Sequence, residues 1–459
     1  MNKLFYLVIL LAGTAFSAEK PNFIIIFTDD QGYADLSCFG GKHISTPHID
    51  KLASEGNRLV SFYVAAPLCT PSRAALMTGC YPKRIDMATG STFPVLLAGD
   101  KKGLNPEEIT IAEVLKRQNY ATAIIGKWHL GDQPEFLPTR QGFDEFYGIP
   151  YSHDIHPYHP ANKKYNFPPL PFLDGERVIE MDPDADYLTK RLTDRAVRFI
   201  EENTDKPFFL YLPHPIPHRP LHVTPETMKT VSSEIKSGLM KEAETGKINY
   251  ALRDKLFKQS ITEIDNSVKA IVDTLKSHGL DDNTMIIFCA DNGPAIGKAT
   301  PLKGRKGSTG EGGMRVPSFV RWPGTIPGNQ TSSEILTAMD LLPTIANLAG
   351  ARLPQKKIDG KDIIQVLKGE AKSPHRYFFY HNVEQLKAVR FEKWKLVLKN
   401  LKPFALYNLD KDISESKNVI DSKPELVESM FQAALDFNKE IETEVRPAAF
   451  VENPVPLKQ

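Results

Sequence analysis

The sequence predicts an α/β protein built on a large, mixed and mostly parallel β-sheet that lies between helices. Its short apolar runs are continuous rather than alternating, which indicates strands covered on both faces. Amphipathic helical segments separate these runs along the chain, an order typical of a parallel sheet. With 459 residues, the chain is long enough for a large core and for more than one domain.

The first segment of the chain is typical of a secretory signal peptide. Lys3 precedes an apolar run of about a dozen residues, and the small residues Ala15, Ser17 and Ala18 then offer a cleavage site. This run is shorter than the ~20 residues of a membrane span, and no later stretch reaches that length. We therefore expect residues 1–18 to be removed, no membrane span, and a periplasmic or secreted protein.

Four apolar runs predict strands, and polar residues follow each of them. The runs cover residues 23–27, 124–125, 208–212 and 285–288. In the same order, the polar residues are Asp29 with Asp30, Lys127 with His129, His214 with His218, and Asp291 with Asn292. Because ligands gather at the carboxyl ends of the strands in such sheets, we expect a site there.

Helical patterns lie between the runs, at residues 110–120, 192–202 and 254–278. In the last of these, Phe257, Ile261, Ile264, Val268, Ile271 and Leu275 recur at three- and four-residue steps. The Pro-rich stretch 150–171 predicts an irregular surface insertion or pocket wall. Beyond residue 350, alternating segments and a helix over 424–440 predict a smaller antiparallel sheet with a helix. We expect a catalytic domain over 19–350 and a smaller α+β domain over 351–459.

Charge and cysteine content restrict the classes of function. The formal net charge is +1, which argues against a nucleic-acid partner, since such proteins usually carry a basic stripe. The four cysteines are Cys38, Cys69, Cys80 and Cys289. Four cysteines in a chain of this length do not form a disulfide scaffold, and the sequence leaves their pairing open.

The two acidic pairs are candidate metal ligands. Adjacent carboxylates repel each other, so a sheet that brings Asp29, Asp30, Asp291 and Asn292 together calls for a cation, and oxygen ligands suit Ca²⁺ or Mg²⁺. The alternative for each pair is an ordinary strand-to-turn junction, because Asp and Asn favour turns.

Cys69 precedes a helical pattern. Thr70 and Pro71 predict a helix cap followed by proline in the first turn. Cys69 would then lie at the positive end of a helix, where a thiol can become a reactive thiolate. A buried structural cysteine is the alternative.

These residues occur in motifs that resemble the sulfatase family. "CTPSR" followed by "AALMTG" is similar to the family's signature, and "FTDDQGYADLSCFGG", "GKWHLG" and "ADNG" stand in the family's order. The segments "FYGIPYSHD" and "GRKGSTGEGGMRVP" resemble the arylsulfatase A-like branch most. The resemblance covers nearly the whole mature chain and implies an alkaline phosphatase-like fold.

The resemblance also implies a role for each site residue. A maturation enzyme would oxidise Cys69 to formylglycine, whose hydrate attacks sulfur and later expels sulfate. One calcium ion would be bound by Asp29, Asp30, Asp291 and Asn292, with position 69 completing its shell. Arg73 would hold the formylglycine, Lys127 and Lys306 would bind sulfate oxygens, His218 would protonate the leaving alcohol, and His129 would accept the second hydroxyl's proton.

Several assignments have competitors. His214 competes with His218, and Lys303 competes with Lys306. Ser152 matches a family active-site serine, and we expect His153 and His214 to contact substrate. The three-residue spacing of His153, His156 and His159 also admits a zinc site, although intervening prolines prevent one helix face.

The expected activity is therefore hydrolysis of an organic sulfate ester, with a sulfated carbohydrate as the preferred substrate class. The sequence leaves open a phosphoester or phosphonate ester hydrolase of the same superfamily. It also leaves open a secreted glycan-binding homologue without activity, although every expected motif residue is present.

Overall fold

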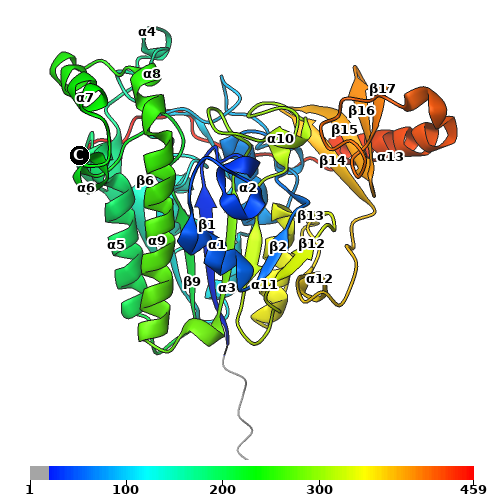
Figure 1. Cartoon of the computed structure of the whole chain (residues 1–459), viewed down its shortest axis with the longest axis horizontal. Coiled ribbons are helices and arrows are strands. Elements are labelled where there is room, and N and C mark those ends of the chain that lie inside the picture. Colours follow the sequence, from blue (N-terminus) through cyan, green and yellow to red (C-terminus); the bar gives the residue numbers. More distant parts are fainter. Residues whose placement is uncertain (1–19) are drawn as a thin grey trace, which may run out of the picture.

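A computed structural model describes residues 20–459 of the chain. The expected signal peptide, residues 1–18, lies outside the described residues. The central feature is a ten-stranded sheet with the order β12-β2-β11-β10-β1-β9-β5-β6-β7-β8. Its middle strands β10, β1, β9, β5 and β6 run parallel, and antiparallel neighbours flank them on both sides. The predicted large, mostly parallel sheet is confirmed (Figure 1).

Helices cover both faces of this sheet, which explains the continuous apolar runs. Along β1 (Asn22–Thr28), Phe23, Ile25 and Phe27 pack into one core. That core also contains apolar residues of α2 (Cys69–Thr78), α3 (Ile111–Lys116) and α11 (Leu341–Leu348). The alternate residues Ile24 and Ile26 pack into a second core with α1 (Pro47–Ser54), α5 (Leu188–Glu201) and α9 (Phe257–Ser277).

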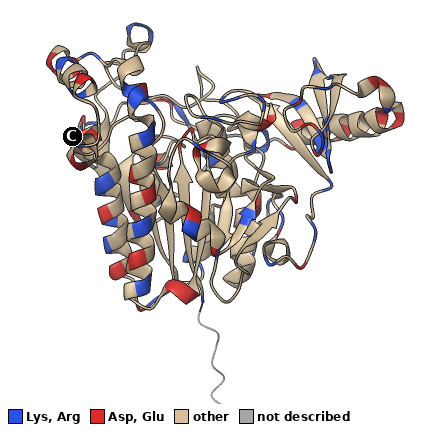
Figure 2. Cartoon of the chain, viewed as in Figure 1, with Lys and Arg blue, Asp and Glu red and all other residues tan. Residues whose placement is uncertain are grey.

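The other nine strands of the large sheet include its parallel middle strands and shorter strands toward both edges. Their bounds are β2 (Asn57–Leu59), β5 (Ala121–Lys127), β6 (Glu145–Ile149), β7 (Pro171–Asp174), β8 (Arg177–Met181), β9 (Phe208–Pro213), β10 (Thr284–Ala290), β11 (Phe319–Arg321) and β12 (Gln330–Ser332). A small pair joins β3 (Phe62–Tyr63) to β13 (Leu336–Thr337). Charged residues of both signs are mixed along the outer sides of α5 and α9 (Figure 2).

A second, four-stranded antiparallel sheet follows in the chain, as the alternating pattern predicts. Its order is β14 (Tyr377–Asn382), β15 (Gln385–Phe391), β16 (Trp394–Lys399) and β17 (Lys402–Asn408). Helix α13 (Pro424–Thr443) packs on it and buries Met430 and Ala434. The two lie together at one end of the large sheet, in orange and red (Figure 1).

The chain then returns to the large unit. Its last strand, β18 (Ala449–Phe450), pairs antiparallel with β4 (Lys102–Gly103).

The described residues contain no helix that is both long and apolar enough to span a membrane. All four cysteines are free thiols in the described structure.

Candidate functional site

The carboxyl ends of the parallel strands carry the polar residues that the sequence singled out. Asp29 and Asp30 follow β1, and Asp291 and Asn292 follow its neighbour β10. The backbone N–H of Asp30 donates to Asp291 Oδ1 at 3.1 Å, and Asn292 Nδ2 donates to Asp30 Oδ1 at 2.6 Å. The paired register of the two strands thus brings all four side chains together.

The backbone at this edge adopts an uncommon conformation. Asp30 has φ 63° and His129 has φ 66°, both in the left-handed region that non-glycine residues seldom occupy. Such conformations persist where surrounding contacts impose them, and they concentrate at functional sites.

Cationic side chains surround the acidic cluster. Arg73 donates to Asp29 Oδ2 at 3.2 Å and to Asp291 Oδ2 at 2.9 Å, while Lys127 pairs with Asp29. Burial would raise the pKa of Asp29, but the neighbouring positive charges, Lys127 foremost, hold that pKa well below its usual range. For Asp291, burial and the charge of Asp29 together raise the pKa.

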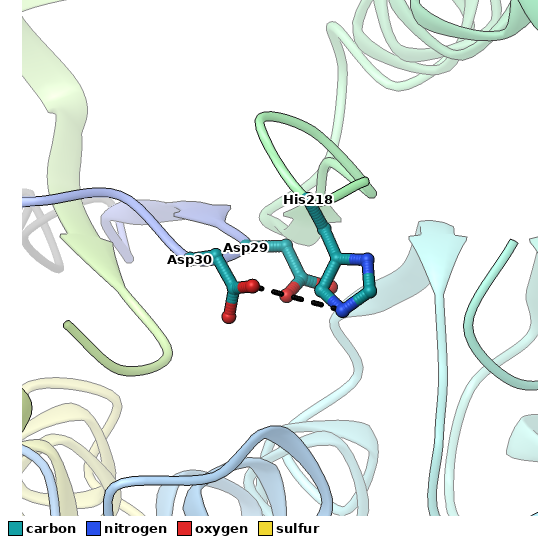
Figure 3. Close-up of side chains that lie close together, drawn as sticks. All are labelled: Asp29, Asp30 and His218. Carbon is teal, nitrogen blue, oxygen red and sulfur yellow. Dashed lines mark ion pairs between the residues drawn. The ribbon is translucent and has the colours of Figure 1, made fainter. Parts of the chain in front are cut away.

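Two oxygens in the cluster have no protein partner. Asp29 Oδ1 and Asn292 Oδ1 are both buried and accept no hydrogen bond in the described structure. Unpartnered buried oxygens are costly unless an ion or water satisfies them. Asp29 and Asp30 also approach His218 closely enough for one atom from each to lie within 4.8 Å of the others (Figure 3). A donor set dominated by carboxylate and amide oxygens fits a hard divalent cation such as Ca²⁺.

Cys69 is the first residue of α2, and its side chain is buried. The residue before it, Leu68, is extended and provides no side-chain cap. The predicted cap at Thr70 is therefore wrong: Thr70 lies inside the first turn, where its Oγ1 accepts a hydrogen bond from the Leu96 N–H at 3.1 Å. Burial raises the pKa of the Cys69 thiol although Lys127 and Lys306 lie nearby. This environment does not favour a simple thiolate nucleophile.

Arg73 lies one helical turn after Cys69 and is completely buried. Besides its two carboxylate partners, its Nη1 donates to the backbone carbonyl of Lys127 at 2.8 Å. These contacts join the first turn of α2 to the ends of β1, β10 and β5, so Arg73 fixes the position of Cys69 over the acidic cluster.

Lys127 and His129 extend from β5. Gly126 has φ 142°, and a Cβ there would lie 2.1 Å from the Pro213 carbonyl oxygen of β9, so only glycine permits this approach. His129 Nε2 donates to the Leu96 carbonyl at 2.9 Å, whereas Nδ1 is buried without a partner. Burial foremost, with Lys127 and Arg73, holds the pKa of His129 well below its usual range. The neutral ring therefore presents a free lone pair at Nδ1.

The structure distinguishes the competing lysines. Lys306 Nζ lies 2.7 Å from Asp30 Oδ1 and lines the same cavity as Cys69. Lys303 Nζ donates instead to the carbonyl of Glu415 at 3.1 Å and stands over the ring of Tyr407.

The competing histidines also differ in position. His218 lines the cavity with its Nε2 3.6 Å from Asp30 Oδ2, and its Nδ1 donates to the Arg219 carbonyl at 2.6 Å. His214 is completely buried, and its Nε2 contacts Ser267 Oγ of α9 at 3.1 Å. The structure brings His218 to the cavity and leaves His214 outside its lining.

A cavity of about 560 Å³ opens above Cys69. Its polar lining includes Cys69, His129, Ser152, Asp154, His159, His218, Lys306 and Asn382. His153 lies behind it, with its ring 5.7 Å from that of His218 and its Nε2 donating to the Pro220 carbonyl at 2.9 Å. Ser152 therefore reaches the cavity directly, and His153 packs against a residue that does.

The three histidines spaced at 153, 156 and 159 do not form a metal-binding group in the described part of the chain. His153 and His159 have different partners: His153 Nε2 donates to the Pro220 carbonyl, whereas His159 Nε2 lies 3.5 Å from Asp154 Oδ2. His156 Nδ1 accepts a hydrogen bond from the Tyr158 N–H at 3.1 Å. The only group of His, Cys, Asp and Glu side chains with metal-like spacing among the described residues is the one in Figure 3.

Other lining residues were not identified as site residues from the sequence. Asp154 lines the cavity and follows Ser152 and His153 in the same sequence motif. Its position two residues after Ser152 is the one sequence feature that could have marked it as a site residue. The aromatic residues Phe93 and Tyr165 and the hairpin residue Asn382 also line the cavity, and no sequence pattern marks them. Asn382 belongs to the second sheet, so both parts of the molecule build the cavity.

Models of known families match most of the chain. The model described as Sulfatase matches residues 21–351, and the model described as N-sulphoglucosamine sulphohydrolase, C-terminal, matches residues 306–440.

Individual relatives agree with these matches. The chain is 36% identical to arylsulfatase A of Homo sapiens over 94% of its length and 90% of the relative's. It is 34% identical to arylsulfatase G of Mus musculus over 82% of its length and 77% of the relative's. The crystal structure of Ps i-CgsB in complex with k-i-k-neocarrahexaose superposes with a TM-score of 0.78 at 34% identity, covering 93% of this chain and 95% of that one. The chain belongs to the sulfatase family and is an enzyme that hydrolyses sulfuric esters.

Proposed function

We propose that this sulfatase acts on a sulfated carbohydrate through a formylglycine made from Cys69 and a calcium ion held beside it. The observation that carries the proposal is the placement of Cys69 at the floor of a cavity, next to buried carboxylates and two lysines. A cysteine with a raised thiol pKa is poorly suited to act unmodified, which supports its conversion.

Asp29, Asp30, Asp291 and Asn292 would hold the calcium ion. The unpartnered oxygens of Asp29 and Asn292 support this assignment, since oxygen donors of this kind match calcium. When bound, the ion would neutralise charge on the sulfate oxygens. A formylglycine at position 69 would supply, as its hydrate, one hydroxyl for attack on sulfur and a second for the release of sulfate.

The chain's own side chains bind and orient the sulfate group. Lys306 carries positive charge at the cavity floor, and Lys127 lies buried nearby, paired with Asp29; the low dielectric there strengthens the attraction of both for an anion. Arg73 fixes position 69 through its hydrogen bonds at the ends of β1, β5 and β10. A sulfate ester would therefore be held with its sulfur facing Cys69 and its alcohol part directed into the cavity.

Two histidines would move protons. His218 presents Nε2 to the cavity, because its Nδ1 is committed to the Arg219 carbonyl. A proton at Nε2 can pass to the leaving alcohol oxygen. His129 presents the free lone pair of Nδ1 and stays neutral, so it can accept a proton from a hydroxyl at position 69.

A carbohydrate substrate is supported by the solved structure of Ps i-CgsB, which was determined with k-i-k-neocarrahexaose bound. We propose that residues 1–18 direct export to the periplasm or the exterior. We also propose a catalytic domain over 19–350, a smaller domain over 351–459, and a maturation enzyme as a transient partner.

Turnover of two matched esters tests the proposed activity. Purified protein with calcium is incubated with an aryl sulfate and with the corresponding aryl phosphate, and free phenol is measured. The proposal expects sulfate release to dominate and to disappear in Cys69→Ala, with circular dichroism showing an intact fold. A preference for the phosphate would favour a phosphoester hydrolase. Full activity of Cys69→Ala would refute the role of position 69.

A further inference from the structure

An irregular loop carries the hydrogen-bond partner of the His129 ring. Residues 91–100 lie between α2 and β4 in the chain and contain no helix or strand. Apart from contacts with their immediate neighbours, their hydrogen bonds to described residues go to Thr70, His129 and Asp132. Two of these bonds are made by the buried residue Leu96. Because no regular element fixes the backbone of Leu96, its position depends on these contacts.

Leu96 connects the first turn of α2 to the histidine. Its N–H donates to Thr70 Oγ1 at 3.1 Å, and its carbonyl accepts a hydrogen bond from His129 Nε2 at 2.9 Å. Thr70 is completely buried and directly follows Cys69. The Thr70 hydroxyl is therefore coupled, through one residue, to the carbonyl that holds the His129 ring.

The Leu96 carbonyl decides which ring nitrogen of His129 carries the proton. A carbonyl oxygen only accepts hydrogen bonds, so Nε2 must be protonated, and in the neutral ring Nδ1 is then the acceptor. No described residue donates to Nδ1, so the Leu96 carbonyl is the one hydrogen-bond partner of this ring in the described structure. Both the tautomer and the orientation of His129 thus depend on Leu96.

We propose that Thr70 is a positioning residue for the release of sulfate. Through Leu96, its hydroxyl keeps Nδ1 of His129 available to the second hydroxyl at position 69. In that step the hydroxyl proton moves to Nδ1 and later to water, the O–H electrons form the C=O bond of the aldehyde, and sulfate leaves with the electrons of its bond to carbon. This role rests on the proposed function and deepens it, because it assigns a residue to the second half of the reaction.

Steady-state and rapid-mixing kinetics with an aryl sulfate test this role. Thr70→Val keeps the shape of the side chain and removes its oxygen. Because only the step after phenol release should slow, we expect kcat and KM to fall together by roughly tenfold while kcat/KM stays unchanged. We also expect a burst of about one phenol per active site. Thr70→Ala should show the same pattern, and Thr70→Ser, which keeps the oxygen, should restore the wild-type kcat.

Two controls separate this role from other effects of the substitutions. Thr70 adjoins Cys69, so a substitution there can alter maturation, and all rates are therefore expressed per formylglycine, counted by mass spectrometry of the peptide. Thr78→Val is the matched variant in the same helix, where the buried Thr78 Oγ1 donates to the Ala74 carbonyl at 2.8 Å. It should leave kcat and KM unchanged.

Three outcomes would overturn the role of Thr70 while wild-type protein still hydrolyses the sulfate, so that the proposed function stands. They are a kcat/KM that falls as far as kcat in Thr70→Val and Thr70→Ala, a wild-type kcat in both, and a Thr70→Ser variant as slow as they are. Absence of turnover in wild-type protein that carries formylglycine and calcium would instead overturn the proposed function and this role together.

Discussion

Lys303 and Lys306 lie on one loop but have different partners, and this pair offers a test of sulfate binding. Lys306 faces Asp30 and the cavity, whereas Lys303 contacts the Glu415 carbonyl. We predict that Lys306→Ala lowers kcat/KM for a sulfate ester by roughly 10²–10³, as expected when one charge-stabilising group is removed. Steady-state kinetics measures this, and Lys303→Ala serves as the control. A comparable loss in both variants would contradict the assignment.

Asn292 gives a test of the proposed calcium site. An ion that binds the folded state alone stabilises it by ~2.7 kcal/mol when the free ion concentration is about 100 times the Kd. We predict that calcium raises the Tm of wild-type protein, that a chelator lowers it, and that Asn292→Ala reduces the shift because one oxygen ligand is lost. Asn266→Ala, on the exposed side of α9, should retain the full shift. Identical calcium shifts in wild type and Asn292→Ala would refute the site.

For individual residues, the sequence indicated which side chains belong to the candidate site but not which contacts those side chains make in the fold. The motifs marked Asp29, Asp30, Asp291 and Asn292, and the structure brings them together because β1 and β10 pair in parallel. The choice between His214 and His218 depended on which side of the loop after β9 faces α9, a tertiary contact that local spacing does not encode. The free Nδ1 of His129 likewise follows from the position of Leu96.

Among the elements, the hairpin between β14 and β15 connects the second sheet to the site. Asn382 Nδ2 donates to the Gly307 carbonyl at 2.9 Å, directly after Lys306, and both Asn382 and Val383 line the cavity. We predict that Asn382→Ala lowers kcat/KM several-fold by loosening the Lys306 loop, with little change in Tm. Lys402→Ala at the start of β17, on the far side of this sheet, is the control. Unchanged kinetics in Asn382→Ala would show that the hairpin does not position the loop.

Elements with strong periodicity were predictable and their ends were not. The apolar repeat from Phe257 to Leu275 corresponds to α9, because its buried residues face the sheet at helical spacing. Thr70 failed as a predicted cap because tertiary packing places Leu96 against its hydroxyl. Capping preferences are local, and a contact from a distant loop can override them.

At the scale of the whole molecule, a buried ionic cluster joins the two sheets. Glu311 accepts hydrogen bonds from Tyr63 and from Tyr380, at 2.5 and 2.8 Å, and pairs with Lys395 at 3.0 Å. Burial would raise the pKa of Glu311, but Lys395 and two nearby arginines lower it to about 2. The ionised form is therefore stabilised by folding.

This cluster predicts a pH dependence of stability. Because the folded pKa lies below the usual 4.5, the contribution of Glu311 is fully present above that pH and is lost as the pH falls toward about 2. Glu311→Gln should lower the free energy of unfolding by about 3 kcal/mol near neutral pH, since it removes the buried carboxylate that pairs with Lys395 and Arg315 and leaves Glu415 as the one acidic partner of Lys395. Urea titrations should show this difference shrinking below about pH 4.5.

Glu107→Gln is the control for this prediction, because the pair of Glu107 with Lys356 is exposed. A difference between wild type and Glu311→Gln that stays constant down to pH 2 would contradict the linkage.

The large sheet and the smaller antiparallel sheet could both be predicted from apolar patterns, whereas their connection could not. The pairing of β18 with β4 joins residues more than 300 positions apart in the chain, and no short-range pattern specifies it. The contribution of Asn382 to the cavity has the same origin. Long-range contacts of this kind depend on the assembled fold.

If Cys69 acts as an oxidised side chain, the peptide that contains it must have an altered mass. Protein that hydrolyses a sulfate ester is digested, and the peptide is analysed by mass spectrometry. We predict the lighter mass that results when the thiol CH₂–SH becomes the aldehyde CHO. A fully active preparation in which every such peptide retains an unmodified thiol would contradict it.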